Sequence, residues 1–333
     1  MILHSRKKLK KILRSKRKST RNKKNSGNVK FRKRKIYDGT MPILLTSIEN
    51  ILCSEDKVKI TENSKFKFYD SEDTSILNIY VYELDSQSYI CFGEHHYIFD
   101  MVSGEIITEI VNKISSYCSE NKARLFVESD DIFDNLKTDT RNFLMHEYND
   151  HDETKIKKSI LLSLSNTKSL DKFKFDIRNK INSVCMQSQL YDVALTIYHN
   201  FKDNDDAMNM LIGYIDFIYI KPYLIYLFEN SDIFSSDETI KSIYEEILSY
   251  YKNSINYLVY NYTDKDKFTK YLDELKWKSH QITDLYLMNN LLKNTISNNI
   301  IYCGGAHAEL LKKYFELKKF KLITEMHFEI KTV

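Results

Sequence analysis

Residues 302–308 of the chain read YCGGAHA, and residues 92–96 read FGEHH. Each stretch begins at the end of a short apolar run, which predicts a strand that ends in a tight turn presenting a histidine. The chain has only seven glycines, and three of them (Gly93, Gly304 and Gly305) come just before a histidine. In parallel sheets, turns at the carboxyl ends of strands are where ligands bind. The two stretches therefore predict both the frame of the fold and the place of a site.

A strand–helix–strand unit starts at the first of these stretches. Residues 103–121 predict a helix with a serine N-cap and one apolar stripe, and residues 124–127 (RLFV) predict the strand that follows. Two strands joined by a crossover helix run parallel, so their carboxyl ends lie at the same edge of the sheet. We therefore expect Glu94, His96 and Glu128 to converge at that edge.

The remaining elements follow from periodicity. Residues 42–83 read as short alternating runs, of which 66–69 and 77–82 predict strands. Residues 130–295 are mostly helical in pattern, with an interruption at residues 172–178. Further helices are predicted over residues 188–201, 205–220, 237–260, 265–294 and 306–317, and further strands over 300–303, 320–323 and 326–330.

Together these elements predict an α/β fold with a mixed, partly parallel central sheet flanked by helices. A helical insertion at about residues 130–295 lies between the two halves of the sheet. With 333 residues, 24 Tyr and 18 Phe, the chain can bury a sizeable core. We expect residues 37–333 to form a single α/β domain.

The N-terminal segment has a different composition from the rest of the chain. Residues 1–35 contain 17 of the 50 Lys and Arg, and the first acidic residue is Asp38, which leaves 33 basic against 46 acidic residues in the remainder. Such a segment predicts a disordered basic tail over residues 1–36. Two interpretations stay open: a solvated tail that aids solubility, or an arm at residues 6–35 that binds nucleic acid or a nucleoprotein particle, or serves as a nuclear address.

Five scattered cysteines without a Cys-x-x-Cys pair argue against a disulfide framework and a structural zinc knuckle, and favour a reducing compartment. No apolar signal stretch precedes the basic run, so an intracellular location, cytoplasm or nucleus, is expected. Heavy use of Lys, Asn, Ile and Tyr is typical of A+T-rich coding, as in some large DNA viruses and protists. For a viral protein the location would be the virion.

One apolar run, residues 207–228, raises the question of a membrane span. It contains Asn209, Asp216 and Lys221, whereas uninterrupted spans carry few charges. The pattern therefore predicts a buried helix that breaks before Pro222, and no transmembrane segment.

Most of the nine histidines are expected to be structural or exposed. His199 and His280 lie on helical patterns without acidic or cysteine neighbours at ligand spacing. Residues 146–151 (HEYNDH) resemble a zinc-binding helix, but a spacing of five turns the second imidazole away from the first, so a polar loop is predicted.

Glu94, His96, Glu128 and His307 differ from these because each follows a predicted strand. Two imidazoles and two carboxylates suit a divalent ion of the Mn, Co, Zn or Fe type with an open position for water. The same groups could work without a metal ion, with a histidine as general base and a glutamate that orients it. A third interpretation is that these side chains only form hydrogen bonds with backbone groups at the strand ends.

Three short motifs carry a resemblance when they are taken in order: residues 93–96 (GEHH), 126–128 (FVE) and 304–307 (GGAH). They resemble the superfamily that joins TraB and TIKI proteins, ChaN-like proteins and erythromycin esterases. Residues 284–288 (DLYLM) are similar to the Asp/Arg and Met pattern of members, and residues 176–178 (DIR) to a mid-chain Asp-x-Arg of some of them. Asp176, Arg178 and Asp284 are therefore secondary candidates for the site.

The resemblance implies a site at the sheet edge that holds His96, His307, Glu94 and Glu128. TIKI-type members are described as metal-dependent proteases, erythromycin esterases as hydrolases that rely on a histidine, and ChaN as a haem-iron binding protein. We expect a metal-dependent hydrolase of peptide or ester bonds, in which His96, His307 and Glu128 hold a divalent ion and Glu94 is the base or a fourth ligand. The alternative is a catalytically inactive binding or effector protein on the same scaffold, attached through the basic tail.

Overall fold

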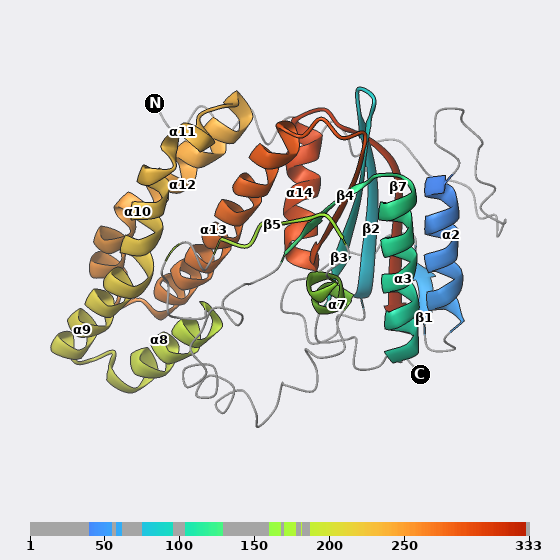
Figure 1. The fold of residues 1–333 in the computed structure, drawn as a ribbon. Coiled ribbons are helices and arrows are strands. Elements are labelled where there is room, and N and C mark those ends of the chain that lie inside the picture. The colour runs from blue at the N-terminus through green and yellow to red at the C-terminus, as the bar shows by residue number, and fades with distance from the viewer. Residues whose placement is uncertain are drawn as a thin grey trace, which may run out of the picture. The chain divides into compact units, whose positions relative to one another are not determined.

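A seven-stranded sheet forms the centre of the fold in the computed structural model (Figure 1). The structure describes residues 40–54, 58–61, 75–95, 104–128, 160–167, 170–177, 181 and 187–330, all within one compact unit of residues 39–333. The predicted basic tail, the strand at 66–69, His96, the segment 146–151 and Arg178 lie outside the described residues.

The order of the strands is β1-β7-β2-β3-β6-β4-β5. Neighbours from β3 to β5 pair in parallel, and neighbours from β1 to β3 pair antiparallel, which confirms the mixed, partly parallel sheet. The bounds are β1 (Val58–Thr61), β2 (Ser75–Leu84), β3 (Gln87–Glu94), β4 (Arg124–Val127), β5 (Lys172–Lys174), β6 (Asn298–Gly304) and β7 (Lys321–Ile330).

Two details of the sheet differ from the prediction. Strands β3 and β4 point the same way, but β6 lies between them and pairs with both, so they are not direct neighbours. The two short strands predicted over residues 320–323 and 326–330 are one strand, β7 (Lys321–Ile330), which pairs with β2 and β1. The carboxyl ends of β3, β4 and β6 still meet at one edge, where the sequence placed the site.

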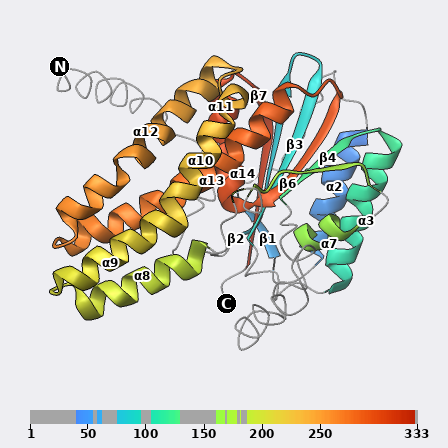
Figure 2. The same ribbon diagram turned by 60° about the vertical axis from the view of Figure 1, so that its left-hand side comes forward.

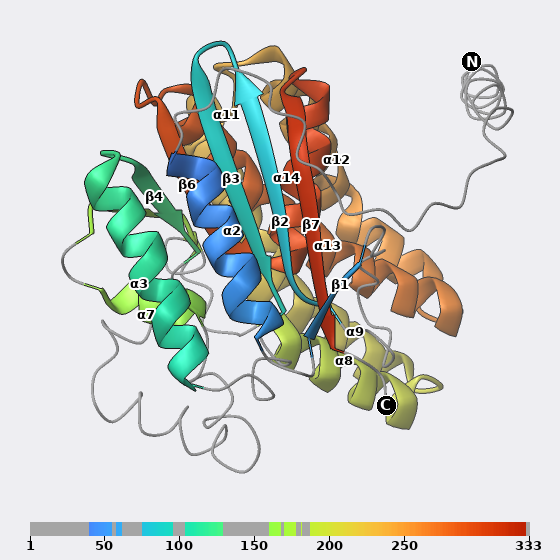
Figure 3. The ribbon, with the colours of Figure 1, turned by 90° about the vertical axis from the view of Figure 1, so that its right-hand side faces the viewer.

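Helices cover both faces of the sheet (Figures 1 and 3). One face carries α2 (Thr40–Cys53), α3 (Gly104–Glu120) and α7 (Ile160–Asn166), and the other carries α14 (Gly305–Leu317) and α13 (Lys265–Leu292). The expectation of alternating runs from residue 42 is wrong for α2, because Leu44, Leu45, Ile48 and Ile51 recur at helical spacing and are buried.

A lobe of helices, residues 187–292, separates β5 from β6 (Figure 2). Its helices are α8 (Gln187–Phe201), α9 (Asp205–Ile215), η3 (Asp216–Ile220), α10 (Lys221–Glu229), α11 (Ser231–Phe234), α12 (Glu238–Asn261) and α13. Buried aromatic residues fill its interior, among them Tyr198, Tyr223, Phe234 and Tyr251. The lobe confirms the helical insertion between the sheet halves, although α7 and β5, within the predicted span, belong to the layers of the sheet.

The predicted break before Pro222 is wrong. The helix runs on from α9 to α10 through η3, a π-turn in which the Lys221 N–H donates to the Asp216 carbonyl. Proline lacks an N–H and clashes with the carbonyl four residues earlier, and the wider π-turn relieves both constraints. Within the described part of the chain, residues 205–229 are the one helix long and apolar enough, by length and composition, to cross a membrane.

Candidate functional site

The turn from β6 into α14 brings the candidate site to the sheet edge. Gly304 is the N-cap of α14, and His307 lies in the first turn of this helix. No glycine among the described residues has a positive φ, so these glycines do not serve a left-handed turn. Gly93 is needed for close approach instead: a Cβ there would lie 2.5 Å from the Ala308 Cβ. The absence of that Cβ lets α14 begin directly against β3.

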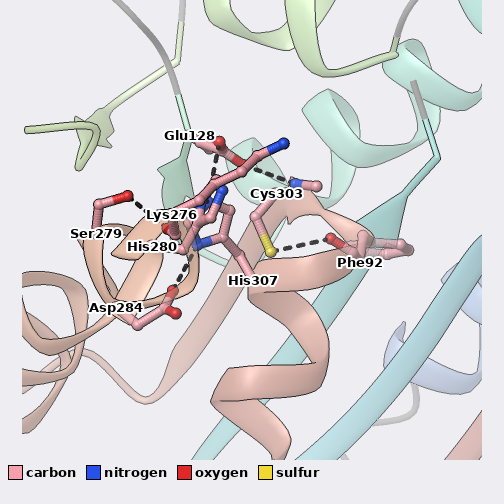
Figure 4. A network of polar contacts seen from close by, with 9 residues as sticks. Phe92, Glu128, Lys276, Ser279, His280, Asp284, Cys303 and His307 are labelled. Carbon is pink, nitrogen blue, oxygen red and sulfur yellow. Dashed lines mark hydrogen bonds and ion pairs between the residues drawn. The ribbon is translucent and has the colours of Figure 1, made fainter. Parts of the chain in front are cut away.

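His307 is buried, 4% exposed, and its two ring nitrogens face different partners (Figure 4). Nδ1 lies 2.8 Å from Oδ1 of Asp284. Nε2 lies 3.3 Å from Oε1 of Glu128 and 3.2 Å from Nδ1 of His280. Two carboxylates and a second imidazole therefore converge on one ring.

Glu128 is fixed by both of its oxygens. It comes directly after β4, and its own N–H donates to the Tyr302 carbonyl of β6 at 2.9 Å. Its Oε2 accepts the N–H of Gly304 at 2.7 Å, at the N-terminus of α14, where a negative charge is stabilised by the helix dipole. Its Oε1 remains directed at His307.

Burial and charge shift the pKa values of this cluster. Burial raises the pKa of Asp284 to about 6, although His307 acts in the opposite direction. Burial alone would lower the pKa of His307, but the charges of Glu128 and Asp284 outweigh it and raise that pKa well above its usual value. The raised pKa of His307 favours the imidazolium form, in which both ring N–H groups can donate. Oδ2 of Asp284 is buried and has no hydrogen-bond partner among the described residues.

His280 is a site residue that sequence reasoning missed. Its helical pattern predicts a structural or exposed histidine, yet its ring packs edge-on against His307 with centroids 4.9 Å apart. The spacing that could have identified it is His280 to Asp284, four residues, which puts both on one face of α13. Lys276 lies one turn earlier on the same face (Figure 4).

Glu94 belongs to a different cluster. Side chains alternate along β3, and since Gly93 faces α14, Glu94 points to the other face of the sheet. Its Oε2 accepts hydrogen bonds from the Tyr302 hydroxyl at 2.9 Å and from the Leu161 N–H of α7 at 3.1 Å. The structure therefore brings His307 and Glu128 together and holds Glu94 at α7.

The secondary candidates Asp284 and Asp176 lie in different places. Asp284 is part of the site, and Asp176 is buried just after β5. Across the described residues, no group of three or more His, Cys, Asp and Glu side chains is arranged to hold a metal ion. The donor types at His307 and Glu128 nevertheless suit one, because metal-binding histidines usually donate their other ring N–H to a carboxylate, as Nδ1 does here.

Comparisons of the chain with protein-family models, with curated proteins and with solved structures found no match. The resemblance to the TraB, ChaN and erythromycin esterase superfamily therefore rests on the sequence motifs alone.

Proposed function

We propose that the chain is a hydrolase of peptide or ester bonds whose centre is His307, with Glu128, His280 and Asp284 around it. The observation that carries the proposal is a buried imidazole held between two carboxylates at the carboxyl edge of parallel strands. A charged cluster of this kind in the core is costly to desolvate, and perturbed groups of this kind gather at functional sites.

The contacts suggest a role for each residue. Asp284 accepts the Nδ1–H of His307 and fixes the orientation of the ring, as the carboxylate of a catalytic triad does. The raised pKa makes His307 a proton donor, so its Nε2–H would protonate the leaving oxygen or nitrogen. Glu128, beside Nε2, would accept the proton of the attacking water. The half-buried His280 would exchange protons with solvent.

We propose the metal-dependent form of this reaction on the donor set. After loss of its Nε2 proton, His307 would hold a divalent ion such as Mn, Co, Zn or Fe together with Glu128, with His96 as the third ligand. The ion supplies a bound water of lowered pKa. Glu94 stays the predicted base or fourth ligand, but its carboxylate would first have to break the hydrogen bond with Tyr302. His280 already lies beside Nε2 of His307 and is therefore the nearer candidate for the same role.

Elemental analysis and turnover of the purified full chain test both forms. The wild type is compared with His307→Ala and His280→Ala, and with His199→Ala as the control on an exposed histidine of the lobe. Peptide and ester libraries are screened with and without added divalent ions. We expect turnover to fall by about 10³-fold or more in His307→Ala and to persist in the control.

Stoichiometric metal lost in His307→Ala but kept in His199→Ala would support the metal-dependent form. Turnover by a metal-free chain would support the acid–base form and exclude the metal-dependent one. Retained turnover in His307→Ala overturns the proposal.

The second candidate is a catalytically inactive binding or effector protein attached through residues 6–35. One observation favours it: both ring nitrogens of His307 face carboxylates, so a protonated His307 has no free lone pair for a metal ion or a water proton. This protein would bind nucleic acid with a strong salt dependence. Charge reversal in the tail would abolish binding, and His307→Ala would leave it unchanged.

A further inference from the structure

One side of the helix formed by α9, η3 and α10 exposes large apolar side chains. Single exposed apolar residues are ordinary on a protein surface, whereas a continuous row of them marks an interaction surface. Successive members of this row, counted through the exposed Lys221 in its middle, lie three or four residues apart, which puts them on one side of the helix. We call this set the apolar stripe: Met210 (77% exposed), Tyr214 (41%), Phe217 (73%), Ile225 (56%) and Phe228 (52%).

The opposite side of the same helix is buried in the lobe. Met208, Leu211, Ile215 and Tyr219 are at most 3% exposed and belong to the core of the chain. The lobe therefore holds the helix in place, and only the side that carries the stripe is open to a partner.

The charged groups around the stripe are of both signs, so a surface of a single charge, anionic or cationic, does not match them. A partner that fits has an apolar face with acidic and basic groups of its own. The acidic groups of the helix are Asp205, Asp206, Asp216 and Glu229, and the basic groups are Lys221, which pairs with Asp216 at 2.8 Å, and Lys252 of α12, whose amine lies 4.9 Å from the ring centroid of Phe228.

The spacing of the stripe reads almost the same in both directions. Counted through Lys221, the steps from Met210 to Phe228 are 4, 3, 4, 4 and 3 residues forward and 3, 4, 4, 3 and 4 residues backward, so the positions coincide to within one residue. A two-fold symmetric contact requires such a pattern, because one surface then meets a copy of itself with the chain direction reversed. Two antiparallel copies would pair Met210 with Phe228, Tyr214 with Ile225 and Phe217 with Lys221.

Gly213 lies on the exposed side of the helix, next to Tyr214. Glycine inside a helix is less favourable than alanine by about 0.5–1 kcal/mol. A Cβ at Gly213 would meet no atom within 4 Å beyond the backbone of its own helix, so packing within the described chain gives no reason for a glycine here. In the antiparallel pair Gly213 would lie opposite Ile225 of the other copy, where the missing side chain lets the two helices approach closely.

We propose that the apolar stripe is the interface of a two-fold symmetric homodimer, in which this helix packs antiparallel against the same helix of a second copy. Side chains of this size carry about 150–250 Å² each, so their exposed fractions offer roughly 600 Å² per copy. The total of about 1,200 Å² is at the lower end of specific interfaces. We therefore expect a weak dimer that depends little on salt, because apolar contacts drive it. The inference stands independently of the proposed hydrolase.

Sedimentation velocity of the purified full chain, at concentrations up to about 100 μM, tests the homodimer. The stripe variant is Met210→Ser with Phe217→Ser, and the matched control is Ile43→Ser with Leu317→Ser, two exposed apolar residues on α2 and α14. Because all four side chains are exposed, both variants should keep the wild-type unfolding temperature, which is checked first. We expect the stripe variant to associate at least about tenfold more weakly than the wild type and the control. A monomeric wild type, or equal association of the stripe variant and the control, overturns the proposal.

Cross-linking tests the antiparallel arrangement. The variants Met210→Cys and Phe228→Cys are oxidised mildly, each alone and as a mixture, and the wild type gives the background from the exposed thiol of Cys53. We expect disulfide-linked dimers that join one variant to the other in the mixture, and only the wild-type background when either variant is alone. Efficient cross-linking of Met210→Cys to itself would contradict the antiparallel pair.

Discussion

Glu94 and Glu128 lie at the same edge of one sheet, yet their surroundings differ. Two neutral groups, the Tyr302 hydroxyl and the Leu161 N–H, donate to Glu94. Glu128 faces the imidazole of His307, which in turn is held by Asp284, and both carboxylates raise the pKa of His307. Both carboxylates therefore share a position at the carboxyl edge, but the partners described for them differ: hydroxyl and amide donors for Glu94, and an imidazole for Glu128.

The surroundings of Glu94 have a clear structural use. Its carboxylate receives the N–H of Leu161 in the first turn of α7, and the Lys172 amine donates to the carbonyls of Leu164, Ser165 and Thr167 at the other end. A negative group at the start and a positive group at the end both match the helix dipole. These two side chains fasten α7 to the sheet.

Removal of Asp284 should have the largest effect on stability. Asp284→Ala leaves the buried charge of His307 with one carboxylate instead of two, and loss of one partner from a buried ion pair costs about 3 kcal/mol or more. Chemical denaturation at pH 7 measures the free energy of unfolding. Asp273→Ala, an exposed aspartate of the same helix, is the control and should change it by less than about 0.5 kcal/mol. Equal effects would show that the pair with His307 does not stabilise the fold.

The pH dependence of stability should follow the raised pKa of Asp284. The native group has a pKa of about 6 against 3.8 ordinarily, so between these values the native state holds a proton that the unfolded chain has lost. Its contribution to the free energy of unfolding therefore falls by about 3 kcal/mol as pH rises from about 4 to 7. The contribution of His307, with its raised pKa, is present below pH 6.5 and is lost only as pH rises through its higher native pKa.

Comparison of the wild type with Asp284→Asn isolates this contribution, because asparagine does not titrate. The difference in unfolding free energy between the two proteins should change across pH 4–7. A constant difference over that range would contradict the raised pKa of Asp284.

Glu94 should show a smaller effect on stability, which comes through its hydrogen bonds to Tyr302 and Leu161. Glu94→Ala removes the acceptor of two buried donors and should destabilise the fold by about 1–3 kcal/mol. Glu94→Gln keeps an acceptor oxygen and should cost less. Under the hydrolase proposal with His280 at the site, Glu94→Gln also retains turnover. Loss of turnover without loss of stability would return Glu94 to the catalytic set.

Lys172→Met should give the smallest change. The substitution keeps the apolar stem and removes the amine at the C-terminal end of α7, at a cost of about 0.3–1 kcal/mol. Thermal unfolding measures this change, with Lys313→Met, at an exposed lysine of α14, as the control. A larger loss would mean that α7 supports more of the sheet than its end contacts indicate.

The strands near Gly93 and Gly304 were predictable from sequence because each is a short apolar run followed at once by glycine and a histidine-bearing turn, which is a local pattern. The sequence did not place β6 between β3 and β4, since β6 pairs with residues 210 positions away in β3 and 175 positions away in β4. Strand alternation from Gly93 could have predicted that Glu94 points away from α14, and helical spacing could have joined His280 to Asp284. The charge state of His307 depends on burial and could not be read from any pattern.

The most direct test of the contrast between the two glutamates is the protonation of His307. Histidine-selective isotope labelling of the full chain, with NMR spectra recorded against pH, follows its imidazole in the wild type, Glu128→Gln and Glu94→Gln. We predict that His307 stays protonated well above pH 6.5 in the wild type and in Glu94→Gln, and that Glu128→Gln lowers its pKa. Titration near 6.5 in the wild type, or an equal shift in both variants, would contradict it.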